Sequence, residues 1–360
     1  MESGETDRSA RLLDFLRQRL GSSALTYAVP PVELRGGFES LIYSFTLGGA
    51  PPEFSGPLVL RVFRRLEDPE RARREALIHN TVAEHGFPAP RVLIAVTSAE
   101  EIGAPFLIMP RVPGATMLAQ FEGLGRGRPS AELIRLVISM PRILRRTISQ
   151  LARTQAQLHR LPGDLLLRAF EREGLNLGAI TFDGRLRTMF DRTGSGPLSD
   201  LRPAVAWLID KCPPQEAASV ICHGDFQPFN VMVKDGEVTG VIDWVNAIVA
   251  EPAFDVGFTV ASFLTVPVPI PFILRQLVYA SIRAGGRSYE RAYRRLAPLP
   301  APRVRYYEAV RCVSELVWMG ARLVGGGARN GAYQSAEGVR RLTGHLRRLT
   351  GVEVRFPFEL

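Results

Sequence analysis

Short β-rich runs follow one amphipathic helix in the first part of the chain. Apolar residues recur at helical spacing between residues 8 and 20, where Leu12, Leu16 and Leu20 share one face, and Gly21 ends the predicted helix. Gly- and Pro-rich breaks then separate three runs that predict an antiparallel meander, at residues 26–34, 41–47 and 57–63.

A second helix is predicted to start at Asp68-Pro69-Glu70, because Asp68 is a candidate N-cap and Pro69 suits the first helical position. The helical pattern continues to about His85, and Gly86 ends it. Two more strand-like runs follow, at residues 91–97 and 105–109. The order is therefore three strands, a helix and two strands.

The pattern becomes mainly helical after residue 115. Helices are predicted through most of residues 115–220 and 256–350, with a break at Gly325-Gly326-Gly327. Residues 184–200 carry loop signals and predict a mobile insertion. No internal repeat is visible.

One apolar run is compatible with either a membrane span or a buried helix. Residues 256–274 contain no charged side chain, and 19 residues would be long enough to cross a bilayer. However, Pro267, Pro269 and Pro271 alternate within the run and oppose a continuous helix. We expect a buried helix to about Thr265, then an extended segment, and no stable membrane span.

Composition and charge place the chain among globular proteins but say little about which partners it binds. It has 360 residues, with 46% hydrophobic and 22% charged residues, and its formal net charge is +9. Lysine occurs only at Lys211 and Lys234, so arginine supplies most of the charge. The arginines are scattered and no nucleic-acid motif accompanies them, so no nucleic-acid binding is expected. The polar first residues and three cysteines without metal spacing favour a cytoplasmic protein with buried free thiols.

The most informative segment runs from His223 to Asp243. Asp225 is followed by Asn230 and then by Asp243, with an Asp-Gly turn between two apolar runs. This turn predicts a hairpin that returns Asn230 and Asp243 to the same end. Carboxylate and amide oxygens suit Mg²⁺. The order Asp, Asn, Asp is that of a kinase-type phosphoryl-transfer site, in which Asp225 would take the hydroxyl proton and the other two would hold Mg²⁺.

The sequence resembles the aminoglycoside phosphotransferase family, which includes macrolide phosphotransferases and choline kinases. The resemblance rests on His223-Gly224-Asp225-Phe226-Gln227-Pro228-Phe229-Asn230 and on Ile242-Asp243-Trp244, and it extends from about residue 25 to about residue 260. It implies an α+β, two-lobe, protein-kinase-like fold: a small N-lobe with an antiparallel sheet plus helix, and a larger, mainly helical C-lobe. The implied division is an N-terminal helical extension at 1–24, a nucleotide-binding N-lobe at 25–112, and a C-lobe at 113–360 with the catalytic loop.

The resemblance also assigns residues around the nucleotide. The loop at residues 35–40 would cover the ATP phosphates, where Ser40 could add a hydroxyl to the backbone N–H groups. Met109 and Val112 lie at the predicted hinge, next to the adenine. In the C-lobe, Asp255 would brace the catalytic loop, and His159 would be structural.

The phosphate-binding residue departs from the common kinase pattern. Kinases of this type pair a strand Lys with a helix Glu, but this chain has no Lys before residue 211. The equivalent position on the third strand is Arg61, and choline kinases also place Arg there. Its expected partner is Glu75 on the next helix; the alternative is a surface pair of Glu75 with Arg71.

The sequence therefore predicts a kinase that uses ATP or GTP with Mg²⁺ to phosphorylate a hydroxyl of a small molecule. Because the C-lobe is rich in arginine, a neutral, apolar or anionic acceptor is favoured over a polycationic aminoglycoside. Two alternatives stay open: a catalytically weak, pseudokinase-type nucleotide-binding regulatory protein, suggested by Arg61, and a protein at the membrane surface. The sequence leaves the acceptor, the choice between ATP and GTP, and the oligomeric state undetermined.

Overall fold

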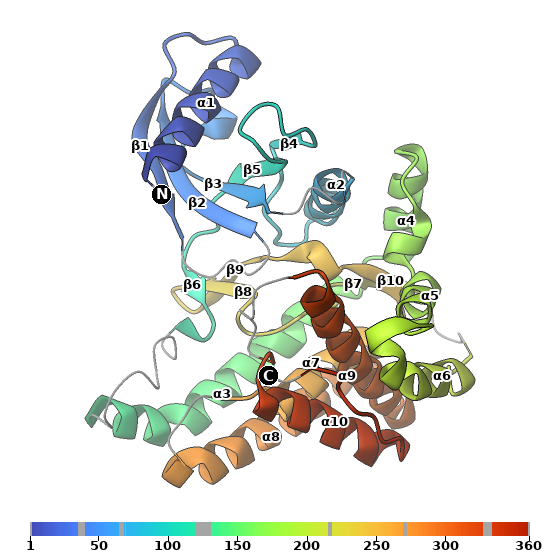
Figure 1. The fold of residues 1–360 in the computed structure, drawn as a ribbon. Helices are drawn as coiled ribbons and strands as arrows, with labels where there is room; N and C mark the ends of the chain where they lie inside the picture. Colours follow the sequence, from blue (N-terminus) through green and yellow to red (C-terminus); the bar gives the residue numbers. More distant parts are fainter. Residues whose placement is uncertain are drawn as a thin grey trace. The chain divides into compact units, whose positions relative to one another are not determined.

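The computed structural model describes residues 2–34, 40–64, 68, 70–119, 131–214, 218–268, 272–326 and 333–358. These residues form two compact units (Figure 1). The first contains Met1–Gly114 with two short later segments, Arg172–Leu175 and Thr239–Ile242. The second contains the rest of the chain.

The first unit is a five-stranded antiparallel sheet with helices packed against it (Figure 1). The strand order is β1-β2-β3-β5-β4. The strands and the two helices of the unit are β1 (Thr26–Glu33), β2 (Ser40–Gly48), β3 (Pro57–Phe63), β4 (Ile94–Val96), β5 (Phe106–Pro110), α1 (Glu2–Leu20) and α2 (Arg71–Glu84).

Alternation along β3 divides the core of this unit between the two faces of the sheet. Leu58, Leu60 and Val62 belong to one cluster, which includes Leu12 and Leu16 of α1. Phe63 lies in a second cluster with residues of α2, and Val59 packs against that cluster. Because side chains of a strand alternate between faces, Arg61 lies on the face of Val59 and Phe63, towards α2.

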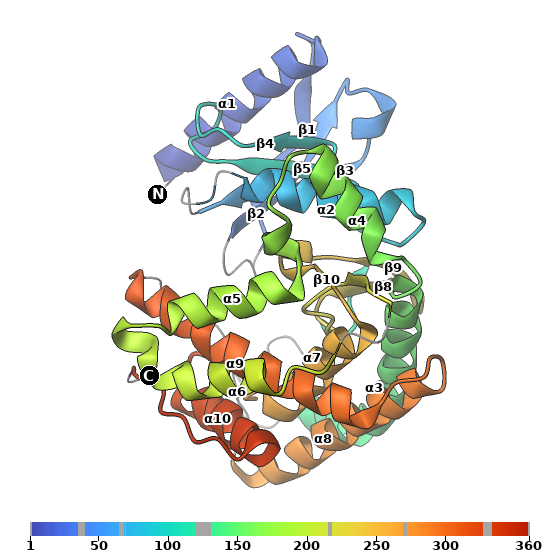
Figure 2. The ribbon, with the colours of Figure 1, turned by 90° about the vertical axis from the view of Figure 1, so that its right-hand side faces the viewer.

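The second unit is mainly helical (Figure 2). Its strands form a β10-β7 pair and part of a β6-β8-β9 sheet, in which residues 239–241 of β9 are grouped with the first unit. The strands are β6 (Ala115–Thr116), β7 (Val220–Cys222), β8 (Val231–Lys234), β9 (Glu237–Val241) and β10 (Ile248–Ala250). The helices are α3 (Ala131–Leu158), α4 (Gly163–Arg172), α5 (Phe182–Arg192), α6 (Arg202–Asp210), α7 (Pro252–Thr265), α8 (Phe272–Arg294), α9 (Ala301–Val324) and α10 (Ala336–Thr350).

Packing in this unit centres on α7, which lies against α8 and α9 and is buried along most of its length. Aromatic and aliphatic side chains of α7 and α9 join those of α6 and the β7–β10 pair in one core. The apolar run after residue 256 therefore forms a buried helix that ends at Thr265, as predicted. Among the described residues, no helix is long and apolar enough to cross a membrane.

Several other local predictions are confirmed. The three predicted strands of the meander match β1, β2 and β3 within two residues. Asp235 and Gly236 both have positive φ, 52° and 87°, as a two-residue hairpin turn between β8 and β9 requires. The fold is α+β and protein-kinase-like, with an antiparallel sheet in the N-terminal unit and a helical C-terminal unit.

Three predictions were wrong. Residues 184–200 are not a mobile loop, since α5 occupies Phe182–Arg192 and a 3₁₀ helix follows at Gly196–Leu201. The side chain of Thr181 caps α5 by accepting the Gly184 N–H, and Leu186 and Met189 are buried at helical spacing. The glycine content had masked this amphipathic pattern.

The other two corrections concern single residues. Asp68 is not the N-cap of α2, which begins at Arg71 after Glu70; instead its carboxylate pairs with the guanidinium of Arg74. Cys212 is exposed, whereas Cys222 and Cys312 are buried free thiols as expected.

Candidate active site

The loop between β7 and β8 carries Asp225, and hydrogen bonds to Asp255 anchor its backbone. The carboxylate of Asp255 accepts the backbone N–H groups of His223 and Gly224, both at 2.8 Å. Asp255 lies in the first turn of α7 and is completely buried. Gly224 has φ of +76°, and a Cβ there would lie 2.0 Å from the carbonyl oxygen of Asn246. Only glycine fits this turn, so the loop has one well-defined path.

A buried hydrogen-bond network supports the anchor. Nε2 of His159 lies 3.2 Å from Asp255 Oδ2, and its Nδ1 lies 2.6 Å from the hydroxyl of Tyr293. Burial tends to raise the pKa of Asp255, but the hydrogen bond and charge of His159, with the charge and backbone N–H of His223, outweigh burial and lower this pKa. His159 is therefore part of the support of the loop, as expected.

His159, Cys222 and Asp255 are also close enough to be considered as metal ligands, because their ligand atoms lie within 4.8 Å of one another. The contacts argue for a structural network instead. The thiol of Cys222 is directed at the carbonyls of Ala250 and Glu251, and burial raises the pKa of this thiol well above its usual value. A protonated thiol is a poor metal ligand.

Asp225 is partly buried, and its carboxylate is held by three neighbours. Asn230 Nδ2 donates to the backbone oxygen of Asp225 at 2.9 Å and to its Oδ2 at 3.2 Å. The amide of Gln227 donates to Oδ1. Arg311 Nη2 lies 3.1 Å from the same Oδ1 and 3.2 Å from Glu315 Oε2. The structure thus brings Asp225 and Asn230 together, as the spacing predicted.

The sequence analysis missed Arg311. This residue lies on α9, is buried, and stacks its guanidinium over the ring of Phe258 at 5.4 Å. Burial tends to lower the pKa of Arg311, but the carboxylates of Glu315 and Asp225 raise it above its usual value. The i,i+4 spacing of Arg311 and Glu315 was the only local signal, and it is common on helices.

Asn230 and Asp243 are suited to a divalent cation. Because Asn230 directs its Nδ2 to Asp225, its amide oxygen points the other way, and an amide oxygen is a hard ligand. Asp243 follows β9 in a left-handed conformation, with φ of 66° and ψ of 64°. A non-glycine residue in this region is uncommon, and such residues cluster at functional sites. The amide oxygen of Asn230 and the carboxylate of Asp243 are therefore suitable ligand atoms for Mg²⁺.

The residues that the sequence predicts beside the nucleotide phosphates lie in the first unit. Arg61 Nη1 forms an ion pair of 2.6 Å with Glu75 Oε1, and Arg61 Nε donates to Ser40 Oγ at 3.0 Å. Ser40, Arg61 and Glu75 are all buried. The predicted Arg61–Glu75 contact is thus confirmed. His79, one turn after Glu75 on α2, lies 3.9 Å from the same carboxylate oxygen.

The remaining predicted residues lie at the end of the sheet. Met109 is buried on β5 opposite Val59 and packs in the cluster next to α2. Val112 follows β5 and is partly buried. Of the phosphate loop predicted at 35–40, residues 35–39 lie outside the described part of the chain, and Ser40 alone can be placed.

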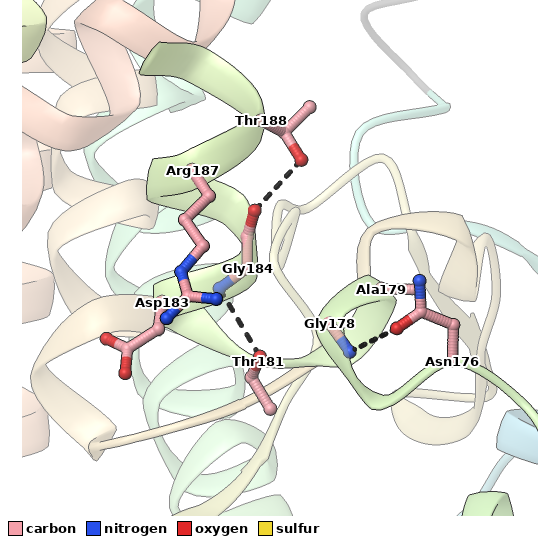
Figure 3. A pocket seen from close by; sticks show the side chains of 8 residues that line it. All are labelled: Asn176, Gly178, Ala179, Thr181, Asp183, Gly184, Arg187 and Thr188. Carbon is pink, nitrogen blue, oxygen red and sulfur yellow. Dashed lines mark hydrogen bonds between the residues drawn. The ribbon is translucent and has the colours of Figure 1, made fainter. Parts of the chain in front are cut away.

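A separate open hollow lies at the start of α5 (Figure 3). It is lined by Asn176, Gly178, Ala179, Thr181, Asp183, Gly184, Arg187 and Thr188. Its labelled hydrogen bonds are local capping and turn contacts, such as Gly178 N to Asn176 Oδ1 at 2.8 Å. None of the predicted site residues lines it.

Solved structures of similar fold include phosphotransferases. A candidate aminoglycoside phosphotransferase from Ralstonia eutropha JMP134 is 18% identical with a TM-score of 0.60, covering 94% of this chain and 96% of that one. A macrolide 2′-phosphotransferase type I is 16% identical with a TM-score of 0.57, covering 95% of both. An aminoglycoside phosphotransferase in ternary complex with AMP-PNP and hygromycin B is 20% identical with a TM-score of 0.54, covering 94% and 97%. At these identities the likeness shows the fold.

Two sequence comparisons give matches, and the second of them assigns the family. Acyl-CoA dehydrogenase family member 11 of Gallus gallus is 23% identical over 199 residues, which are 54% of this chain and 23% of that protein. This chain therefore matches less than a quarter of the length of that relative. The model of the Phosphotransferase enzyme family matches residues 32–292, which include Arg61, Asp225 and Asp243. The chain belongs to the Phosphotransferase enzyme family.

Proposed function

We propose that the chain is a Mg²⁺-dependent kinase that transfers the terminal phosphoryl group of ATP or GTP to a hydroxyl of a small molecule. One observation carries this proposal: the Asp225 carboxylate is presented on a loop whose backbone is anchored by buried Asp255, and it contacts the amide of Asn230. The family match supports the reaction class.

Asp225 would act as the base. The acceptor oxygen attacks the γ-phosphorus, its proton passes to the Asp225 carboxylate, and the bond from the γ-phosphorus to the leaving nucleoside diphosphate breaks. Arg311 would keep the carboxylate in place through its ion pair of 3.1 Å. Much of the rate enhancement in such reactions comes from positioning and charge stabilisation.

Asn230 and Asp243 would hold Mg²⁺, which, when bound, would neutralise charge on the nucleotide phosphates. Arg61 would contact the phosphates, with its guanidinium steadied by Glu75 and Ser40. Met109 and Val112 would lie near the adenine. In this proposal residues 25–112 form the nucleotide-binding lobe and residues 113–360 the lobe that binds the acceptor. The cytoplasmic location stays a prediction.

The test is a screen for nucleotide consumption across a library of hydroxyl compounds, with ATP and with GTP, and with detection of the phosphorylated product by mass. The variant Asp225→Asn removes the proton acceptor, so kcat should fall by roughly 10²–10⁴-fold, the usual worth of a positioned acid–base group. Affinity for the Mg–nucleotide complex should stay nearly unchanged, because Asp225 is not one of the proposed metal ligands.

Asp235→Asn is the matched control, because Asp235 is an exposed aspartate at the turn of the adjacent hairpin and Asn tolerates its positive φ. This variant should keep wild-type kcat. A near-wild-type kcat in Asp225→Asn would exclude the base role. Nucleotide binding without any turnover by the wild type would favour the regulatory, pseudokinase-type alternative.

A further inference from the structure

A second arginine, Arg185 on α5, lies in the same region as Asp225 and Arg311. Its guanidinium stacks over Phe254 at 5.3 Å and over Phe258 at 5.8 Å. Phe258 is also the ring under the guanidinium of Arg311, at 5.4 Å. Arg311 in turn contacts Asp225 at 3.1 Å. Two guanidinium groups therefore share one aromatic ring beside the proposed base.

The two arginines differ in how their charge is balanced. Arg311 pairs with both Asp225 and Glu315. Within the described ranges of the chain, Arg185 forms no ion pair with a carboxylate, and its Nη2 bond to the carbonyl of Asn246, at 3.0 Å, is its one hydrogen bond. Burial and then the charge of Arg311 lower the pKa of Arg185 to about 10, although the charges of Asp255 and Asp225 act in the opposite direction; Arg185 still stays charged at neutral pH.

A guanidinium that is partly removed from water and contacts no carboxylate directly is unfavourable, so such an arrangement indicates a group that becomes paired when a ligand binds. A planar guanidinium can bind a carboxylate or a phosphate through two parallel hydrogen bonds. Asn246 accepts from one nitrogen of Arg185, and the side chain is only partly buried. The remaining N–H groups of Arg185 can therefore donate to an incoming anion.

We propose that Arg185 binds an acidic group of the acceptor, so that the substrates of this chain are hydroxyl compounds that also carry a carboxylate or a phosphate. The inference rests on the proposed function, because it places this anion site beside the proposed base. Arg311 neutralises Asp225, and this reduces the repulsion between its carboxylate and the acidic group of the acceptor. A cationic acceptor fits less well, since Asp225 and Glu315 are already paired with Arg311.

The kinetic test compares matched acceptors: a hydroxy acid with its primary amide, and a phosphate monoester with its parent polyol. Wild-type kcat/KM should favour the anion by about 10–100-fold, as expected for charge-assisted hydrogen bonds to one guanidinium. In Arg185→Gln this preference should fall to within about threefold, while turnover of the amide or polyol is retained. Retained turnover shows that the variant is folded and that its chemistry is intact.

The control variant is Arg187→Gln, which removes an exposed arginine two residues away on the same helix. It should keep the wild-type preference. Equal turnover of acid and amide by the wild type, or a preference for amino sugars, would overturn the inference and leave the proposed kinase activity standing. Comparing the hydroxy acid and amide pair with the phosphate monoester and polyol pair shows whether Arg185 binds a carboxylate or a phosphate.

A binding measurement makes the test independent of turnover. Calorimetry with inorganic phosphate and with glycerate as probes should show binding that weakens roughly tenfold in Arg185→Gln and stays unchanged in Arg187→Gln. Binding of both probes that does not depend on Arg185 would contradict the anion site. Binding that depends on Arg185, together with no phosphoryl transfer to any hydroxyl compound, would confirm the anion site and instead refute the proposed function.

Discussion

Replacing Asp255 should remove the anchor of the loop that carries Asp225. In Asp255→Ala the N–H groups of His223 and Gly224, both buried, lose their acceptor, and His159 loses its partner. Hydrogen bonds to charged groups contribute about 1.5–3 kcal/mol each, and removal of one partner from a buried charged pair costs about 3–5 kcal/mol. We therefore expect a loss of roughly 3–5 kcal/mol, a large part of the stability of a typical domain, ~5–15 kcal/mol.

The assay is thermal unfolding combined with nucleotide turnover. A loss of this size corresponds to a decrease in Tm of roughly 6–20 °C for a unit of more than 150 residues. Asp255→Asn should restore little of the lost stability. Its one amide oxygen can accept the N–H of either His223 or Gly224, and its NH₂ group would then face the other N–H. Asp235→Asn, the exposed aspartate control, should leave Tm unchanged. An unchanged Tm in Asp255→Ala would refute the anchoring role.

The pH dependence gives a second check with a definite sign. The pKa of Asp255 is lowered in the folded chain, so its stabilising contribution is fully present above the unfolded value, about 3.9. The contribution is lost as pH falls through the folded pKa. The difference in unfolding free energy between wild type and Asp255→Asn should therefore be constant from pH 7 to about pH 5 and shrink below about pH 4. A difference that grows on acidification would contradict this linkage.

Two further predictions concern the nucleotide. Asp243→Ala should abolish turnover and weaken binding of Mg–ATP, because a carboxylate is the ligand that Mg²⁺ prefers; calorimetry with unchanged Mg–ATP affinity would exclude Asp243 as the main ligand. Arg61→Ala should raise the KM for nucleotide strongly, whereas Arg61→Lys should retain part of the activity, because charge at the phosphates matters most; wild-type kinetics in Arg61→Ala would show that Arg61 is not the phosphate anchor.

Much of the site was predictable because its determinants are local. Glycine at position 224 and the Asp-Gly turn after β8 fix the backbone around Asp225 and Asn230, and both features can be recognised in a short stretch of sequence. The Arg61–Glu75 pair was predictable for a related reason. Alternation along β3 selects the face of Arg61, and the next helix in the sequence covers that face.

The arginines around Asp225 could not be predicted, because their positions depend on how distant helices pack. Arg185 lies on α5 and Arg311 on α9, and both meet Phe258 of α7 only in the folded unit. The sequence contains so many arginines that composition singles out none of them. The mistaken loop at residues 184–200 added to the difficulty, since it removed Arg185 from any helix face.

Arginine at position 61 makes contacts that a lysine could not copy. A guanidinium carries its N–H donors in a fixed plane; Nη1 of Arg61 forms an ion pair with Glu75, and its Nε donates to Ser40 Oγ. The planar group therefore reaches two different partners from two different nitrogens. A Lys ammonium has all its donors on one nitrogen, so it cannot reproduce this planar arrangement. In the proposed function, Arg61→Lys should therefore retain only part of the activity, because the charge is kept but the planar contact to two partners is lost.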